Sequence, residues 1–253
     1  MIYIKTQKEI DFIRESCRIV AETLRLVKSN VKVGITTLEL DQIAEDYIKS
    51  NNAIPAFKGY SQGGLPGFPG SVCTSVNDAV VHGIPGQVKL EDGDIISLDV
   101  GVLKNNYYGD AATSVAVGKI SDEKRKLLEV TERSLQLGIE QARSGNKVHD
   151  ISAAVQEYVE QNGFSIVRDL CGHGVGKFLH EDPAIPNFGR RGTGPKLKKG
   201  MTLAIEPMVN TGGYEVSTST DGWTVITADG SPSAHFEHTI LILDNSPEIL
   251  TIC

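Results

Sequence analysis

Five side chains that bind hard metal ions lie at or beside predicted strands. They are Asp99, Asp110, His173, Glu206 and Glu237. Acidic residues are depleted in strands, so each of these positions needs a physical reason. The charge of four carboxylates is balanced by two divalent cations, and oxygen ligands with one imidazole suit a pair of Mn, Fe, Co or Zn ions that hold a water between them. The set therefore predicts a dinuclear hydrolytic centre.

Asp99 and Asp110 belong to one predicted hairpin, in which strand-forming residues flank the Lys-Asn-Asn cluster at 104–106. If the hairpin is centred between Lys104 and Asn105, Asp99 faces Asp110 directly, with Cβ atoms about 5 Å apart. Like charges so close require a proton or a cation between them. The alternative is a register that differs by one residue, which turns one carboxylate to solvent.

Glu206 and Glu237 each interrupt an apolar strand, and Glu206 is followed by Pro207, which is typical of a strand end at a cavity. A solvated strand edge is the alternative. His173 lies between two glycines, so the backbone can approach it closely. A structural histidine and a thiol protease site with Cys171 are alternatives for this segment, which lacks the spacing of a phosphate-binding loop. The sequence also has no HExxH zinc motif.

Composition excludes several classes of protein. The 253 residues include 40% hydrophobic and 23% charged residues, and the formal net charge is −7. A negative chain is a poor partner for nucleic acid or an anionic membrane. We expect neither a signal peptide nor a membrane span, because the first residues lack a basic segment leading into an apolar run and no apolar run approaches 18 residues. Four cysteines without CxxC spacing, at 17, 73, 171 and 253, indicate reduced thiols in a cytoplasmic protein.

The elements around these residues occur twice. Helices are predicted from the capping box Thr6-x-x-Glu9, from the capping box Thr36-x-x-Glu39, at 121–143 and at 148–161. Strands are predicted at 71–75, 95–102, 107–112, 164–168 and 201–209, with a final hairpin of arms 223–227 and 235–243 around Asp229-Gly230. A shift of 111 residues aligns Gly34 with Gly145 and Tyr47 with Tyr158. We therefore expect a single domain, 1–253, with repeats of about 1–118 and 119–253 that share one sheet and one core.

In order and spacing, several motifs of the chain resemble those of type I methionine aminopeptidases. They are Asn77-Asp78-x-x-x-His82-Gly-Ile-Pro, the two aspartates eleven residues apart, Cys171-Gly-His173-Gly-Val-Gly with His180-Glu-x-Pro, Ala204-Ile-Glu206-Pro-Met, Asp221-Gly-Trp223-Thr and Phe236-Glu237-His238-Thr. The resemblance extends over essentially the whole chain. It implies the α+β pita-bread fold, a pseudo-two-fold repeat with a curved antiparallel sheet and outer helices. It also implies a catalytic domain without the amino-terminal zinc-binding extension of some relatives and without the insertion of type II enzymes.

The resemblance further implies two divalent metal ions, which are Co, Mn, Fe or Zn. Asp99 would bind one ion and His173 and Glu206 the other. Asp110 and Glu237 would bridge both. Such a site holds a metal-bridged hydroxide that attacks the carbonyl of the first residue of a polypeptide.

Three further roles follow from the same resemblance. Glu206 would relay the proton of the attacking group to the leaving amine. His180 would donate a hydrogen bond to the carbonyl oxygen as charge develops on it, and His82 would contact the backbone beside the scissile bond. A free α-amine near Asp99 would confine cleavage to the terminus.

An apolar pocket for the methionine side chain is expected from Phe68, Cys73 and Trp223, for which plain core packing is the alternative. Two departures from the family bear on this pocket. Leu179 stands where relatives often have an aromatic residue, and the segment 60–67 is long and rich in glycine. The width of the pocket is thus less firmly predicted than the chemistry.

The predicted function is removal of the N-terminal methionine from nascent proteins and peptides when the second residue is small. The expected partners are N-termini of nascent polypeptides, with the ribosome as a candidate place of encounter, and the chain is expected to be a monomer. An Xaa-Pro aminopeptidase or dipeptidase of the same fold is one alternative, because fold and metal ligands do not define the substrate. A metal-free peptide-binding module is another, and it predicts lost ligands.

Overall fold

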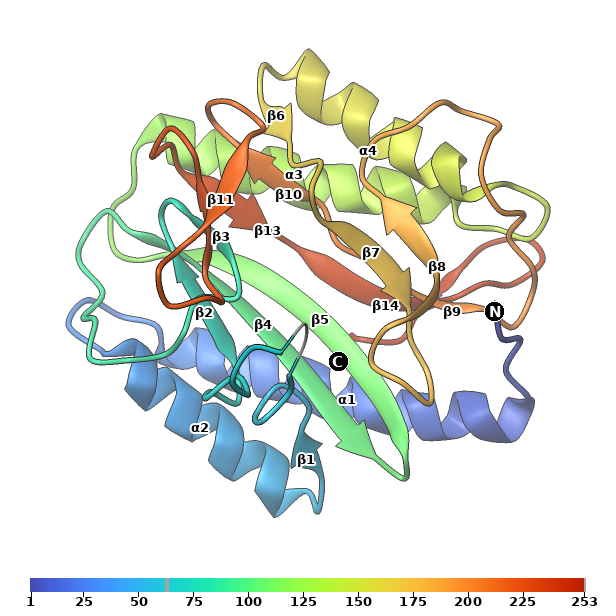
Figure 1. Ribbon diagram of the computed structural model, residues 1–253, viewed down its shortest axis with the longest axis horizontal. Coiled ribbons are helices and arrows are strands. Elements are labelled where there is room, and N and C mark those ends of the chain that lie inside the picture. The colour runs from blue at the N-terminus through green and yellow to red at the C-terminus, as the bar shows by residue number, and fades with distance from the viewer. Residues whose placement is uncertain (62–63, 253) are drawn as a thin grey trace.

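A curved antiparallel sheet with helices on its outer face forms the centre of the computed structural model, which describes residues 1–61 and 64–252 (Figure 1). In these residues the helices are α1 (Gln7–Asn30), α2 (Thr37–Ser50), α3 (Asp122–Gln141) and α4 (Val148–Gln161). The strands are β1 (Ile54–Pro55), β2 (Cys73–Val76), β3 (Ala79–Val81), β4 (Ile95–Lys104), β5 (Tyr107–Ala116), β6 (Ser165–Ile166), β7 (Cys171–Gly174), β8 (Glu181–Pro186), β9 (Thr202–Ile205), β10 (Met208–Asn210), β11 (Val216–Thr218), β12 (Val225–Thr227), β13 (Ser233–His235), β14 (Glu237–Leu241) and β15 (Glu248–Ile249). Two predictions, on part of the segment 60–67 and on Cys253, lie outside the described residues.

The helices begin where the capping residues predicted. Thr6 precedes α1, and its backbone N–H donates to the Glu9 carboxylate at 2.8 Å while its hydroxyl accepts from the Glu9 N–H. Thr36 and Glu39 form the same reciprocal pair ahead of α2. These contacts satisfy backbone donors that have no partner inside a helix.

The strand order of the main sheet has approximate two-fold symmetry. The order is β1-β4-β5-β14-β9-β7-β8, with β2 beside β4 and β15 beside β14. The two halves of the sheet meet at a seam, where β5 pairs with β14. On the side of β5 the next strands are β4 and then β2, and on the side of β14 they are β9 and then β7. The helices α1 and α2 pack on the first half of the sheet and α3 and α4 on the second, as the two main groups of buried apolar side chains show (Figure 1).

Alternation along the strands separates the helix-covered face of the sheet from the opposite face. Leu98 and Val100 of β4 pack with the first helix pair, and Leu203 and Ile205 of β9 pack with the second. Asp99 lies between the first two residues and therefore points away from the helices, because successive side chains of a strand alternate. The acids of β5 and β14 follow the same rule, so they also lie on the face opposite the helices, which we call the uncovered face.

The register predicted for the acidic hairpin is wrong by two residues. Lys104 pairs with Tyr107, so Asp99 lies opposite Ala112 and not opposite Asp110. The turn consists of Asn105 and Asn106, whose φ angles are 52° and 62°. Asparagine tolerates these positive angles, which permits a two-residue turn that fits the twist of the strands. A shift by two positions keeps every side chain on its face, so both carboxylates still share one face.

Two strand predictions in the second half are also wrong. The predicted strand 201–209 is divided at Glu206-Pro207 into β9 and β10, because proline has no N–H for the ladder. β10 instead pairs with β13 and β6 in a small separate sheet. The predicted hairpin of 223–227 and 235–243 does not form, since β12 pairs with β3 and β11, and β14 enters the main sheet between β5 and β9.

We expect Gly109→Ala to lower the free energy of unfolding by about 1–3 kcal/mol, because an added methyl group overpacks the contact between β5 and α1. A Cβ at Gly109 would lie 2.6 Å from the backbone nitrogen of Cys17 and 2.9 Å from its Cα, and neither atom can move without displacing α1. Urea unfolding measures the difference. The control is Gly86→Ala, where an added Cβ has no heavy atom within 4 Å. Equal midpoints for the two variants would contradict the close approach of α1 to β5.

Candidate metal centre and active site

A cavity of about 290 Å³ on the uncovered face of the sheet contains every residue that the sequence indicated for chemistry. Its lining includes Phe68, Cys73, His82, Asp99, Asp110, His173, His180, Glu206, Trp223 and Glu237. These ten side chains come from both halves of the chain. The structure thus places them together in one cavity.

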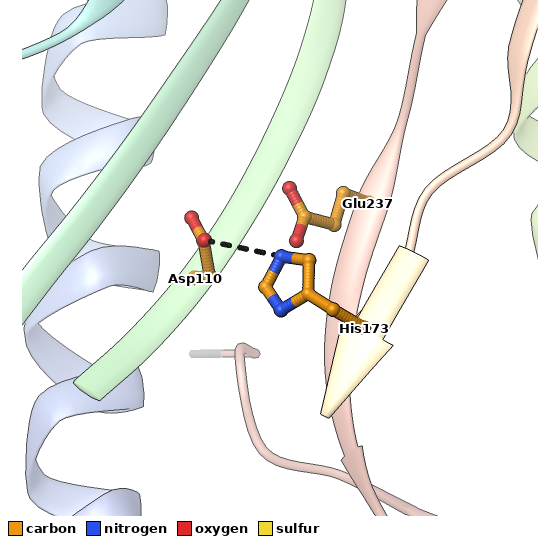
Figure 2. A group of neighbouring side chains, drawn as sticks. All are labelled: Asp110, His173 and Glu237. Atoms are coloured by element: carbon orange, nitrogen blue, oxygen red, sulfur yellow. Dashed lines mark ion pairs between the residues drawn. The ribbon is translucent and has the colours of Figure 1, made fainter. Parts of the chain in front are cut away.

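Three of these side chains converge most closely. Asp110 from β5, His173 from β7 and Glu237 from β14 each offer one ligand atom, and these atoms lie within 4.8 Å of one another (Figure 2). The Nε2 atom of His173 lies 3.9 Å from Asp110 Oδ2 and 3.5 Å from Oε1 of Glu206, which follows β9. Side chains from β5, β7 and β14 thus converge, and the carboxylate that follows β9 lies against the His173 imidazole.

The ladder of the main sheet explains this convergence. Cys73, Asp99, Ala112 and Glu237 are partners in one row across β2, β4, β5 and β14. Side chains in such a row share a face, and the short alanine leaves space between the two carboxylates. His173 belongs to a neighbouring row, in which His173 of β7 pairs with Ala204 of β9, and Ala204 pairs with Thr239 of β14.

Asp110 is joined to that second row by two hydrogen bonds. The Thr239 hydroxyl donates to the Asp110 carbonyl at 2.7 Å and accepts from the Asp110 N–H at 3.2 Å. This contact lies at the β5–β14 seam, where the two halves of the sheet meet. It fixes the backbone of an acid from the first half against β14, which carries Glu237.

A backbone contact sets the protonation of His173. Its Nδ1 lies 2.9 Å from the Gly174 carbonyl oxygen, which can only accept, so Nδ1 carries the proton and Nε2 has a free lone pair. Burial lowers the pKa of His173 to about 3, and the imidazole is therefore neutral at pH 7. A neutral imidazole whose other nitrogen donates to a carbonyl is the usual form of a metal-binding histidine.

The carboxylates are held where their charge is unfavourable. Burial raises the pKa of Asp99 to about 7, and burial with the neighbouring charges of Asp99 and Glu206 raises the pKa of Asp110 well above its usual range. Burial raises the pKa of Glu206 and of Glu237 in the same way. Such groups need either a proton or a cation beside them.

Orphaned oxygens show that the site fits a divalent cation. Asp99 Oδ1, Asp110 Oδ1 and Glu237 Oε1 are buried and have no hydrogen-bond partner in the described part of the chain. A buried acceptor without a partner is costly, and native structures rarely leave several together. Carboxylate oxygens and one imidazole are the ligands that Mn, Fe, Co and Zn accept.

Two further histidines border the carboxylates. His82 follows β3 with φ of 59°, and burial lowers its pKa to about 4. The ring of His180 lies 4.4 Å from the ring of His173, centroid to centroid, and burial lowers the pKa of His180 as well. Both imidazoles are accordingly neutral at pH 7 and can donate one N–H each.

The far wall of the cavity is apolar. The rings of Phe68 and Trp223 meet edge to face with centroids 5.5 Å apart, and the Trp223 indole N–H donates to the Pro66 carbonyl at 3.0 Å. Cys73 is 4% exposed, and burial raises the pKa of its thiol, which stays protonated. Leu179 also lines the cavity.

Tyr60 and His235 were not predicted from the sequence, although both contact residues of the cavity. The Tyr60 hydroxyl lies 2.9 Å from His180 Nδ1, and nothing in the sequence pairs these two distant positions. His235 is 1% exposed, and its Nε2 lies 3.9 Å from Glu206 Oε2. A signal for His235 did exist, because it shares a strand face with Glu237 two residues later.

Comparisons with known proteins agree with this geometry. The model of metallopeptidase family M24 matches residues 11–244. The chain is 56% identical over 252 residues to a methionine aminopeptidase of Clostridium perfringens, with 100% of this chain and 99% of the relative covered. It also matches the crystal structure of a methionine aminopeptidase from Thermotoga maritima with a TM-score of 0.96 and 45% identity, over 100% of both chains.

The chain therefore belongs to metallopeptidase family M24. Within this family, the predicted resemblance to the methionine aminopeptidases is confirmed. The predicted pita-bread fold is confirmed as well. A prolidase from Pyrococcus furiosus shares the fold with a TM-score of 0.76 at 23% identity, over 99% of this chain and 65% of that one.

We expect a divalent metal to stabilise the metal-stripped protein more at pH 8 than at pH 5.5. The pKa of Asp99 is raised in the folded metal-free protein, so this carboxyl keeps a proton at pH values where the unfolded chain has lost it. The stability that this proton contributes to the folded state is lost as pH rises from about 4 through about 7. Metal binding must displace that proton, so the proton on Asp99 competes with the metal more strongly at pH 5.5 than at pH 8. Thermal unfolding with and without Mn²⁺ at both pH values measures this. An equal rise in Tm at the two pH values would contradict the prediction.

Proposed function

We propose that this chain removes the N-terminal methionine from nascent proteins and peptides whose second residue is small. One observation supports this most strongly: the converging ligands Asp110, His173 and Glu237 share their cavity with an apolar wall that can accept a methionine side chain. The two methionine aminopeptidases named above match this chain over essentially their full length. The reaction is therefore hydrolysis of the first peptide bond.

The proposed cofactors are two divalent ions, Co, Mn, Fe or Zn. Asp99 would hold one ion, His173 and Glu206 the other, and Asp110 and Glu237 both. The orphaned carboxylate oxygens and the unprotonated Nε2 of His173 support this assignment. When bound, such ions polarise a carbonyl group and lower the pKa of water to near neutrality.

The side chains around this centre supply the proton transfers. We assign to Glu206 the role of accepting a proton from the attacking water and passing it to the leaving amine. His180 would donate to the carbonyl oxygen, for which its proton must lie on Nε2. That tautomer results when the Tyr60 hydroxyl donates to Nδ1. His82 would donate to the backbone beside the scissile bond.

Substrate selection would occur at two places. The side chain of the first residue would lie against Phe68, Cys73 and Trp223, because these residues form an apolar surface. The free α-amine would lie near Asp99, on the edge of the carboxylate cluster. An internal peptide bond lacks this amine, which explains why cleavage would be confined to the terminus.

The proposed context of the enzyme is a reducing cytoplasm. Cys17 and Cys73 are buried free thiols, and Cys171 is an exposed one, which suits reducing conditions. No helix in residues 1–61 and 64–252 has the length and apolar character that a membrane span requires. We further propose a monomer, formed as one domain with repeats of about 1–118 and 119–253, that meets its substrates at or near the ribosome.

The proposed function is tested by turnover of metal-stripped protein with Mn, Fe, Co or Zn added back, on Met-Ala-Ser and Ala-Pro peptides side by side. We expect metal-dependent release of methionine from the first peptide alone. Cleavage of Ala-Pro instead would assign the chain to the Xaa-Pro enzymes, whose fold it shares. No cleavage of either peptide, together with no bound metal, would leave a binding module.

The assignment of Glu206 and Asp110 is tested by two substitutions. Glu206→Gln should retain metal but lower kcat by at least about 100-fold, because the proton acceptor is lost while a ligand oxygen remains. Asp110→Ala should lose both metal and turnover. Metal content by mass spectrometry and methionine release measure the two effects. An active Asp110→Ala enzyme with two bound ions would overturn the assignment.

A further inference from the structure

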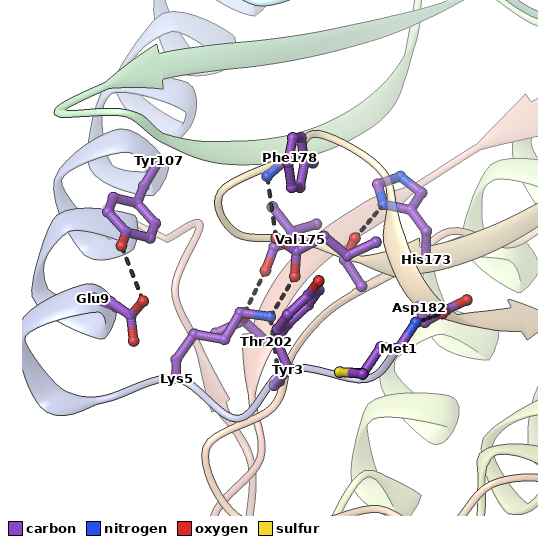
Figure 3. Close-up of polar contacts among 12 residues, drawn as sticks. Met1, Tyr3, Lys5, Glu9, Tyr107, His173, Val175, Phe178, Asp182 and Thr202 are labelled. Atoms are coloured by element: carbon purple, nitrogen blue, oxygen red, sulfur yellow. Dashed lines mark hydrogen bonds and ion pairs between the residues drawn. The ribbon is translucent and has the colours of Figure 1, made fainter.

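The first six residues of the chain form a strap that lies against the segment carrying His180. We call residues 1–6 the N-terminal strap, and residues 175–181 the His180 loop. The Lys5 N–H donates to the Gly200 carbonyl at 2.9 Å, just before β9. Figure 3 shows Lys5 and Tyr3 of the strap reaching toward the strands and loop around Val175, Phe178 and Thr202.

One ion pair joins the strap to the loop. Lys5 Nζ lies 2.7 Å from Glu181 Oε2, and the two side chains are 5% and 2% exposed. Another lysine–carboxylate pair, Lys199 with Asp244, has side chains that are 62% and 61% exposed. An exposed pair contributes little, whereas breaking a buried pair leaves a charge without a partner. Removing one partner of the Lys5–Glu181 pair is therefore expected to perturb the loop more than removing one partner of a surface pair.

The second oxygen of Glu181 closes the loop. Glu181 Oε1 accepts from the Phe178 N–H at 3.1 Å, and the Gly176 N–H donates to the Phe178 carbonyl at 3.1 Å. A Cβ at Gly176 would lie 2.7 Å from both Glu181 Oε1 and Lys5 Cε. The Glu181 carboxylate and the Lys5 side chain thus pack directly against the loop backbone at Gly176.

The outer side of the loop is tied to the metal-binding strands. The Tyr108 N–H donates to the Gly176 carbonyl at 2.8 Å, two residues before Asp110 on β5. The Val175 N–H donates to the Thr202 carbonyl at 3.0 Å, on β9. Held from both sides, the loop presents His180, the residue directly before Glu181, to the ring of His173.

We propose that Lys5 is a positioning residue for catalysis, which acts through its buried ion pair with Glu181 to hold His180 where it can donate to the substrate carbonyl. This inference rests on the proposed function. A displacement of about 1 Å in a group that acts on the transition state can cost about 100-fold in rate. A segment 175 residues away in sequence from His180 accordingly contributes to the rate of the reaction.

The test is steady-state kinetics of Lys5→Met on Met-Ala-Ser with Mn²⁺. We expect kcat to fall at least about 10-fold while KM changes less than about 3-fold, because the hydrogen bond from His180 strengthens only as charge develops on the carbonyl oxygen. In a His180→Ala background the same substitution should change kcat less than about 2-fold. A purely structural role predicts equal losses in the two backgrounds.

Controls separate the possible outcomes. Lys199→Met removes an exposed lysine with the same chemistry and should leave kcat unchanged. Circular dichroism verifies folding, and if Lys5→Met does not fold, Glu181→Gln, which keeps the acceptor for Phe178, is judged by the same criteria. If neither variant folds, or if the losses are additive with His180→Ala, the pair is only structural and the proposal is wrong.

A wild-type enzyme that releases no methionine would refute the proposed function itself. An active wild type with unchanged Lys5→Met kinetics would refute only this inference.

Discussion

The burial of four like charges on one face of a sheet is the constraint on which the rest of this structure depends. The main sheet brings Asp99 and Glu237 into one row and Asp110 beside Thr239 at the seam. In the ionised form these carboxylates oppose folding, so without a cation the buried groups hold protons, and the apolar packing of the helices on the opposite face keeps the strands together. Cation binding removes the repulsion, and the fold and the metal centre are thus thermodynamically coupled.

Residue type and alternation indicated the acidic members of the candidate site, whereas His82, His180 and the apolar wall were expected only from the family resemblance. A carboxylate that interrupts an apolar strand is recognisable without any knowledge of strand pairing, as Glu206 and Glu237 show. The face of Asp99 and Asp110 was also predictable, although their register was not, because a shift of two positions preserves the face. Capping boxes likewise predicted the starts of α1 and α2 from local hydrogen bonding alone.

Pairing between distant segments could not be read in this way. The strand predicted at 201–209 is apolar on both sides of Glu206-Pro207, and only the tertiary structure shows that the chain changes sheets there. The contact of Tyr60 with His180 and that of Lys5 with Glu181 join positions more than 100 residues apart, so no spacing rule applies to them. These contacts fix the orientation of side chains whose identity the sequence had already indicated.

Because the two halves of the sheet come from the two halves of the chain, the proposed metal ligands are synthesised in two groups. The amino-terminal half carries Asp99 and Asp110 in a hairpin that can close locally, whereas His173, Glu206 and Glu237 emerge from the ribosome later. β14 inserts beside β5 only after nearly the whole polypeptide has been made. A product that ends before β7 would carry only Asp99 and Asp110 of the five proposed metal ligands, and the edge of β5 that pairs with β14 would be open.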